Sequence, residues 1–130
     1  MNRIPPLILL VVCCLLSGCQ NNSPIERAGR KTEAVLAEYQ RSGNASPAVT
    51  YLLAYQGEAP GSQKMAVLAE WAIANRASFV GLVSAIPRKD RSTFLNHFCS
   101  VAGEFGLDAS FKRAFQQEKS LVIQEILKQL

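Results

Sequence analysis

Ser23-Pro24-Ile25-Glu26 is the clearest helix start in this 130-residue chain. The serine hydroxyl can accept a hydrogen bond from a first-turn amide, proline suits the first helical position, and glutamate completes the Ser-x-x-Glu capping box. Apolar or small residues follow at helical spacing, at positions 25, 28, 35, 36 and 39. The stretch therefore predicts a helix that ends near residue 42, with Gly43 as its left-handed terminator.

The same pattern of start signals and apolar stripes continues to residue 130. Five further helices are predicted, over residues 48–56 after a Ser46-Pro47 start, 62–75, 78–86, 90 or 92 to 105, and 108–130, with residues 57–61 as a turn. Gly106 is expected to end the fifth helix of the chain, and Asp108 is expected to cap the last one. No segment alternates apolar and polar residues with period two. The expected fold is all-α, with five to six short amphipathic helices packed as helical hairpins or as a small bundle.

A short similarity recurs within the chain. Ala34–Tyr39 (AVLAEY) returns as Ala66–Trp71 (AVLAEW) 32 residues later, and Glu104-Phe105 gives a weaker third match. A true repeat predicts three stacked helical hairpins with a concave binding face. Shared composition among Ala-, Leu- and Glu-rich helices explains the similarity equally simply.

An apolar run of 13 residues, at positions 4–16, lies behind Arg3. It is shorter than the roughly 20 residues that span a bilayer and fits a secretory leader. The run ends in Leu16-Ser17-Gly18-Cys19, which resembles the lipobox of bacterial lipoprotein precursors. The resemblance implies cleavage between Gly18 and Cys19 and attachment of palmitate or similar acyl chains to Cys19. An uncleaved anchor and an ordinary signal peptide are the alternatives.

This interpretation fixes the expected organisation and location of the chain. Residues 1–18 are a cleaved signal peptide, residues 19–22 a lipidated tether, and residues 23–130 a single helical domain. Gln20 follows the cysteine in place of the Asp that usually retains lipoproteins at the inner membrane. The resemblance therefore implies the periplasmic face of the outer membrane; in a Gram-positive host it implies the outer face of the cytoplasmic membrane.

The net charge and the cysteines argue against two classes of protein, those that bind nucleic acid and those held together by disulfides. A net charge of +4 is too weak for a nucleic-acid-binding protein, so no nucleic-acid partner is expected. Cys13 and Cys14 lie in the predicted leader and Cys19 takes the lipid, so Cys99 remains alone and cannot form an intrachain disulfide. Its neighbours Phe98 and Val101 favour a buried thiol.

No group of residues predicts catalysis or metal binding. His97, the one histidine, is two residues from Cys99, so the two side chains are on different faces of their predicted helix. His97 is expected at the surface or at the edge of the core. We therefore expect no cofactor, no metal and no enzymatic activity.

Three cations stand out at the predicted start of a helix, in Pro87-Arg88-Lys89-Asp90-Arg91. The helix macrodipole disfavours positive charge at that position. Arg88, Lys89 and Arg91 are therefore candidate contacts for anionic lipid or for an acidic patch on a partner. The alternative is an exposed charged turn that serves solubility.

These observations favour a non-enzymatic docking or accessory module, tethered to the membrane through Cys19, with a protein partner in the envelope. In outline the chain is similar to the pilotins of secretion systems. The alternatives are an entry-exclusion or immunity lipoprotein of a mobile element and, remotely, an envelope enzyme. A groove between hairpins would receive an amphipathic helix. The candidate aromatic anchors are those that are exposed among Tyr39, Tyr51, Tyr55, Trp71 and Phe79.

Overall fold

The computed structural model describes residues 23–130, and all regular structure in this part of the chain is helical. The seven helices are α2 (Pro24–Ser42), α3 (Ser46–Leu53), α4 (Glu58–Ala74), α5 (Arg76–Ser84), α6 (Arg88–Glu104), α7 (Asp108–Phe115) and α8 (Leu121–Gln129). The prediction of an all-α fold is confirmed. The predicted number of five to six helices is too low, because the last predicted helix is two helices.

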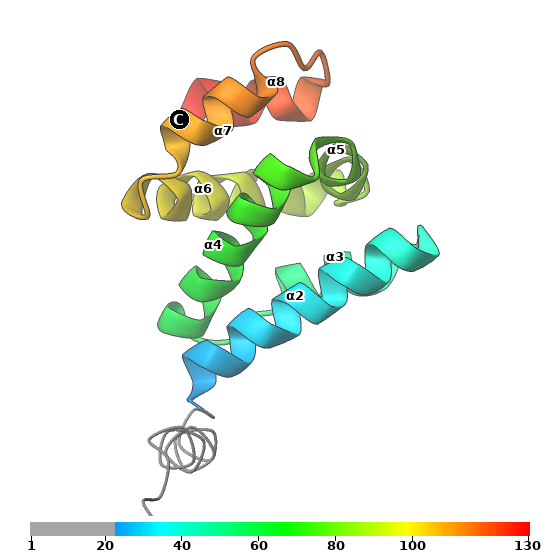
Figure 1. Ribbon diagram of the computed structural model, residues 1–130, viewed down its shortest axis with the longest axis vertical. Coiled ribbons are helices and arrows are strands. Elements are labelled where there is room, and N and C mark those ends of the chain that lie inside the picture. The colour runs from blue at the N-terminus through cyan, green and yellow to red at the C-terminus, as the bar shows by residue number, and fades with distance from the viewer. Residues whose placement is uncertain (1–22) are drawn as a thin grey trace, which may run out of the picture.

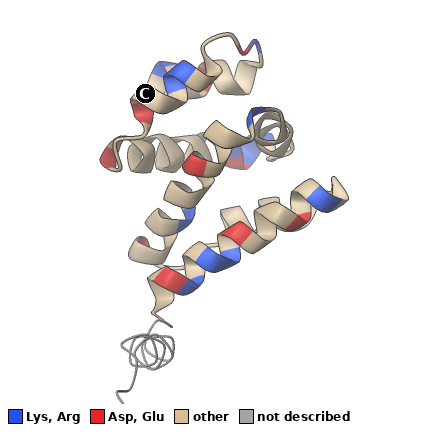
Figure 2. Ribbon diagram, in the orientation of Figure 1, with Lys and Arg blue, Asp and Glu red and all other residues tan. Residues whose placement is uncertain are grey.

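Helix α4 is the centre of the arrangement (Figure 1), since it packs against α2, α5, α6 and α7. Helices α2 and α3 lie together at one end of the long axis, and α7 and α8 lie at the other end, beyond α6. Helix α8 packs on both α6 and α5. Residues of both charge signs are distributed along α2 (Figure 2), which packs mainly against α4.

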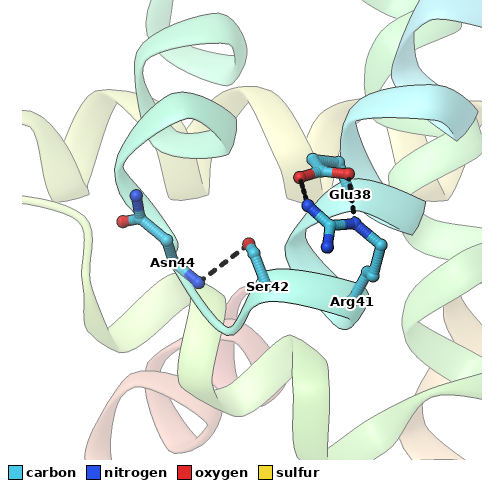
Figure 3. Close-up of polar contacts among 4 residues, drawn as sticks. All are labelled: Glu38, Arg41, Ser42 and Asn44. Carbon is cyan, nitrogen blue, oxygen red and sulfur yellow. Dashed lines mark hydrogen bonds and ion pairs between the residues drawn. The ribbon is translucent and has the colours of Figure 1, made fainter.

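The two ends of α2 follow the sequence pattern closely. The backbone N–H of Glu26 donates to Ser23 Oγ at 3.2 Å, and Gly43 adopts φ 71° and donates its N–H to the carbonyl of Tyr39. In the last turns of α2, Arg41 forms a bidentate ion pair with Glu38 (Figure 3). The hydrogen bonds from Arg41 hold the pKa of the exposed Glu38 carboxyl below its usual range.

Ser46 is the first residue of α3 and not its predicted cap, since Ala45 occupies the cap position and Asn44 precedes it. The backbone N–H of Asn44 donates to Ser42 Oγ at 3.1 Å (Figure 3), and Asn44 Oδ1 accepts from the N–H of Ser46 at 3.2 Å. These two local hydrogen bonds occupy backbone N–H groups just before and at the start of α3, in place of a cap by a side chain at the cap position. Helix α3 also ends at Leu53, three residues before the predicted Gln56.

Helix α4 begins earlier than predicted, because residues 58–61 form its first turn and not a loop. Gly57 precedes the helix with φ 95°, and the N–H of Gly61 donates to the carbonyl of Gly57 at 3.0 Å. Pro60 is compatible with this position because first-turn amides need no intrahelical acceptor. The predicted start at Ser62 is therefore wrong.

The starts of α5, α6 and α7 also differ from the predicted ones. Helix α5 begins at Arg76 and not at Ser78, and α6 begins at Arg88, directly after Pro87. Asp108 is the first residue of α7 and not its cap, since Leu107 occupies the cap position. Gly106, predicted as a terminator, follows α6 with φ 68°.

The predicted final helix is interrupted between α7 and α8 by the polar residues 116–120. Glu118 Oε1 accepts from the backbone N–H groups of Lys119 and Ser120 at 3.2 and 3.3 Å. Gln124 Nε2 donates to the Glu118 carbonyl at 2.8 Å. Glu118 thus provides the acceptors that an uninterrupted helix would otherwise supply, and α8 turns back over α6 and α5.

Four phenylalanines form the centre of the core. Phe79 of α5 lies 5.4 Å from Phe98, 5.7 Å from Phe111 and 5.6 Å from Phe115, measured between ring centroids. All four rings are fully buried. Helices α5, α6 and α7 are therefore held together by one aromatic cluster.

The two segments of the internal similarity lie in α2 and α4, which pack against each other. Leu36 and Leu68 occupy equivalent places in the two copies, and both are fully buried. Tyr39 and Trp71, also equivalent, meet edge to face at 6.4 Å. From α2 to α7, long helices of 17–19 residues alternate with short ones of 8–9, whereas α8, with 9 residues, follows another short helix. Whether the copies share an origin stays a prediction.

Candidate functional site

The predicted lipidation site, Gly18 and Cys19, lies outside the described residues 23–130. None of the helices in the described part of the chain combines the length and apolar character that crossing a bilayer requires.

The cationic stretch Arg88, Lys89 and Arg91 forms the first turn of α6, and its members have different surroundings. Arg91 is partly buried, and its Nη2 donates to the carbonyls of Ile86 at 3.0 Å and Ser84 at 3.4 Å. These carbonyls belong to the last residue of α5 and to the turn that follows it, and a positive charge is stabilising at a helix C-terminus. Arg91 therefore connects α5 to α6, and its buried Nε has no hydrogen-bond partner in residues 23–130.

Arg88 and Arg91 line a groove of about 550 Å³ between α6 and α8, whereas Lys89 is not among its lining residues. Leu95 and Val122 are buried side chains of this groove. Its other lining residues are Ser92, Leu121, Glu125, Lys128 and Gln129. We call this feature the α6–α8 groove. It combines three cations and one carboxylate with an apolar floor.

Leu121 is the most exposed aliphatic side chain of the groove, with 80% of its surface accessible. It is the first residue of α8, directly after the polar interruption. A leucine at such a position gains nothing from folding of the isolated domain. Together with the cations it makes the α6–α8 groove the best candidate for a protein contact.

The candidate aromatic anchors do not form one continuous surface. Phe79 and Tyr51 are buried, which removes both from the candidate anchors. Tyr39 and Trp71 are partly buried against each other, and a Cβ at Gly81 would lie only 2.7 Å from the Tyr39 hydroxyl. Only Tyr55 is freely exposed, at 89%.

A buried polar cluster between α2, α3 and α4 was not predicted. Lys64 is 2% exposed, and its Nζ donates to the carbonyls of Tyr51 at 2.9 Å and Ala54 at 2.7 Å. Tyr51 in turn contacts Thr32, with 3.0 Å between the two hydroxyl oxygens. Burial lowers the pKa of the Lys64 ammonium. The spacing of Lys64 from Leu68 places the lysine on the apolar stripe of α4, and this was the available signal.

His97 and Cys99 lie on opposite sides of α6, as predicted. His97 is exposed and covers the start of α4, where a Cβ at Gly61 would lie 3.5 Å from its Cε1. Cys99 is buried, which confirms that prediction, and its Sγ lies 3.8 Å from the carbonyl of Ile126. Burial raises the pKa of the Cys99 thiol to about 11. The two side chains therefore form no catalytic pair.

The raised pKa predicts that Cys99 in the folded protein resists alkylation. At pH 8 a thiol with a pKa of about 11 is roughly 0.1% thiolate, about a hundredfold less than an ordinary cysteine. Iodoacetamide should therefore label the Cys99 peptide at least about a hundred times more slowly than in the urea-unfolded chain, as measured by mass spectrometry. Equal rates in the two states would contradict the buried thiol.

Among residues 23–130, no three His, Cys, Asp or Glu side chains are grouped closely enough to hold a metal ion. Comparisons with protein-family models, with curated proteins and with solved structures gave no match.

Proposed function

We propose that this protein is a membrane-tethered, pilotin-like lipoprotein whose α6–α8 groove binds an amphipathic helix of an envelope protein. The lipid on Cys19 supplies the attachment, and the groove supplies the recognition. The observation that carries the proposal is the meeting of exposed Leu121 with a mainly cationic rim in one groove.

The chemistry of the groove specifies the kind of helix. Arg88, Arg91 and Lys128 are opposed within the lining only by Glu125. A partner helix with acidic residues beside its apolar stripe would pair with these cations and cover Leu121. A helix with a basic flank would meet charges of its own sign.

The position of the groove favours a protein partner over lipid headgroups. Helix α2 has 19 residues and is therefore about 28 Å long. The start of α6 is near its far end, because Asn44 after α2 and Pro87 before α6 line the same small pocket. A tether joined to the start of α2 would hold that end of the protein at the membrane. The groove would then lie several electrostatic screening lengths from the lipid headgroups.

Charge reversal in the groove tests the proposal. A photo-crosslinking amino acid at Leu121 should capture one partner from intact envelopes, and its crosslinked segment should be an acidic amphipathic helix. The double variant Arg88→Glu with Lys128→Glu should lower this yield at least about tenfold, because like charges across an interface cost several kcal/mol. Both residues are exposed, so the fold should tolerate the change.

The matched control reverses Lys112 and Arg113, which are exposed on α7 and do not line the groove. It should leave the crosslink from Leu121 unchanged. A crosslink that is insensitive to reversal at Arg88 and Lys128, or one obtained equally from the exposed Glu33 on α2, would refute the groove as the docking site.

A further inference from the structure

A second cavity, of about 530 Å³, lies where the end of α3, the start of α4 and the middle of α6 meet. Its volume is in the range of pockets that hold small ligands. The apolar part of the wall includes Leu52, Leu53 and the exposed ring of Tyr55. The polar part includes Lys64, Thr93 and His97, with the exposed carboxylate of Glu58 also in the lining.

Lys64 is an unusual wall residue, because a buried ammonium ordinarily has an anionic partner. Within residues 23–130 it has no carboxylate partner, and two backbone carbonyls accept its hydrogen bonds. Its Nζ also lies over the Tyr51 ring, 4.9 Å from the ring centroid, so the ammonium has an aromatic partner as well but no counter-ion. An anion in the cavity would supply the missing counter-ion.

Two further features offer hydrogen-bond donors around the same space. His97 makes no hydrogen bond within residues 23–130, so its ring N–H is available to a ligand. Helix α4 begins at the cavity with Gly57 and Glu58, and no side chain caps its first amides. A helix N-terminus attracts negative charge, which reinforces the effect of Lys64.

We propose that this cavity binds the carboxylate of a single-chain fatty acid, with the headgroup at Lys64 and His97 and the acyl chain along Leu52, Leu53 and Tyr55. The lining sets the orientation, because the Lys64 ammonium and the His97 ring donor belong to α4 and α6, while these apolar side chains belong to α3 and the segment that follows it. The inference does not depend on the α6–α8 groove, whose lining shares no residue with this cavity.

Photolabelling of the full chain with a diazirine analogue of decanoate tests the proposal. Mass spectrometry should locate the label within residues 52–64 or 93–97. Unlabelled decanoate should compete for this labelling at a concentration at least about tenfold lower than decanol, because only the acid offers a charged acceptor to Lys64. Equal competition by the two compounds, or label only elsewhere, would overturn the inference. This arm requires no variant.

A pair of substitutions at Gly61 supplies the structural control. A Cβ there makes an ordinary 3.5 Å contact with His97, so Gly61→Ala should retain the labelling. Gly61→Leu should place its larger side chain in the cavity and abolish the labelling, while circular dichroism shows an unchanged helix content. A folded Gly61→Leu chain that is labelled as strongly as the unmodified one would refute the site.

Discussion

Phe79→Ala is expected to lower the free energy of unfolding by about 3–5 kcal/mol, the largest effect on stability of any single truncation considered for this chain. The ring is 0% exposed and is within 6 Å, centroid to centroid, of Phe98, Phe111 and Phe115. Its removal leaves a cavity at the junction of α5, α6 and α7. Rigid helices close such a cavity only partly, so lost dispersion contacts add to the lost burial.

Urea unfolding followed by the fluorescence of Trp71 would measure this loss, because the one tryptophan in the chain lies outside the phenylalanine cluster. The matched control is Tyr55→Ala, which truncates a ring that is 89% exposed and should change the free energy of unfolding by less than about 0.5 kcal/mol. A loss below about 1 kcal/mol for Phe79→Ala would show that the cluster is not the centre of the core.

Phe79 also shows where the sequence was insufficient. Apolar periodicity identifies a helix and its buried side, but a short helix with few polar residues has no clear exposed side. Helix α5 carries one charged residue, Arg76, within nine positions. The sequence therefore predicted the helix but left open whether Phe79, its one aromatic residue, is exposed or buried. The same holds for Tyr51 on the similarly apolar α3.

Helix boundaries were missed where local polar contacts compete with helix continuation. Between α7 and α8, the Glu118 side chain accepts hydrogen bonds from the backbone amides of Lys119 and Ser120, the two residues that follow it. The polar run Gln116–Ser120 was a visible signal, because it interrupts the apolar stripe between Phe115 and Val122. Pro60 caused the opposite error, a helical turn predicted as a loop, because in a sequence a proline in the first turn of a helix cannot be told from a proline in a loop.

The candidate sites were predictable only in part. The cations at residues 88–91 were visible as a cluster, but their division between an α5 contact for Arg91 and an open position for Arg88 depends on tertiary packing. The α8 side of the groove could not be predicted while α7 and α8 were taken as one helix. Lys64 was overlooked because a lysine on an apolar stripe ordinarily extends its ammonium to solvent.

Cys19→Ala is expected to move the protein from the membrane fraction to the soluble fraction almost completely. One acyl chain gives only marginal binding, whereas two chains anchor stably, at about 0.8 kcal/mol for each buried methylene. If the resemblance to a lipobox is correct, the substitution removes every chain at once. The alanine variant should be expressed behind an ordinary cleavable leader, so that the apolar run at positions 4–16 cannot hold it at the membrane.

Intact-mass measurement makes this test independent of fractionation. The unmodified protein should lose residues 1–18 and gain the mass of its acyl groups, and Cys99→Ala, the matched control, should behave in the same way. A polypeptide mass without lipid, or a Cys19→Ala protein that stays in the membrane fraction, would refute the tether. The variant also separates attachment from docking, because a soluble domain with an intact α6–α8 groove should still crosslink to its partner through Leu121 while no longer holding that partner at the membrane.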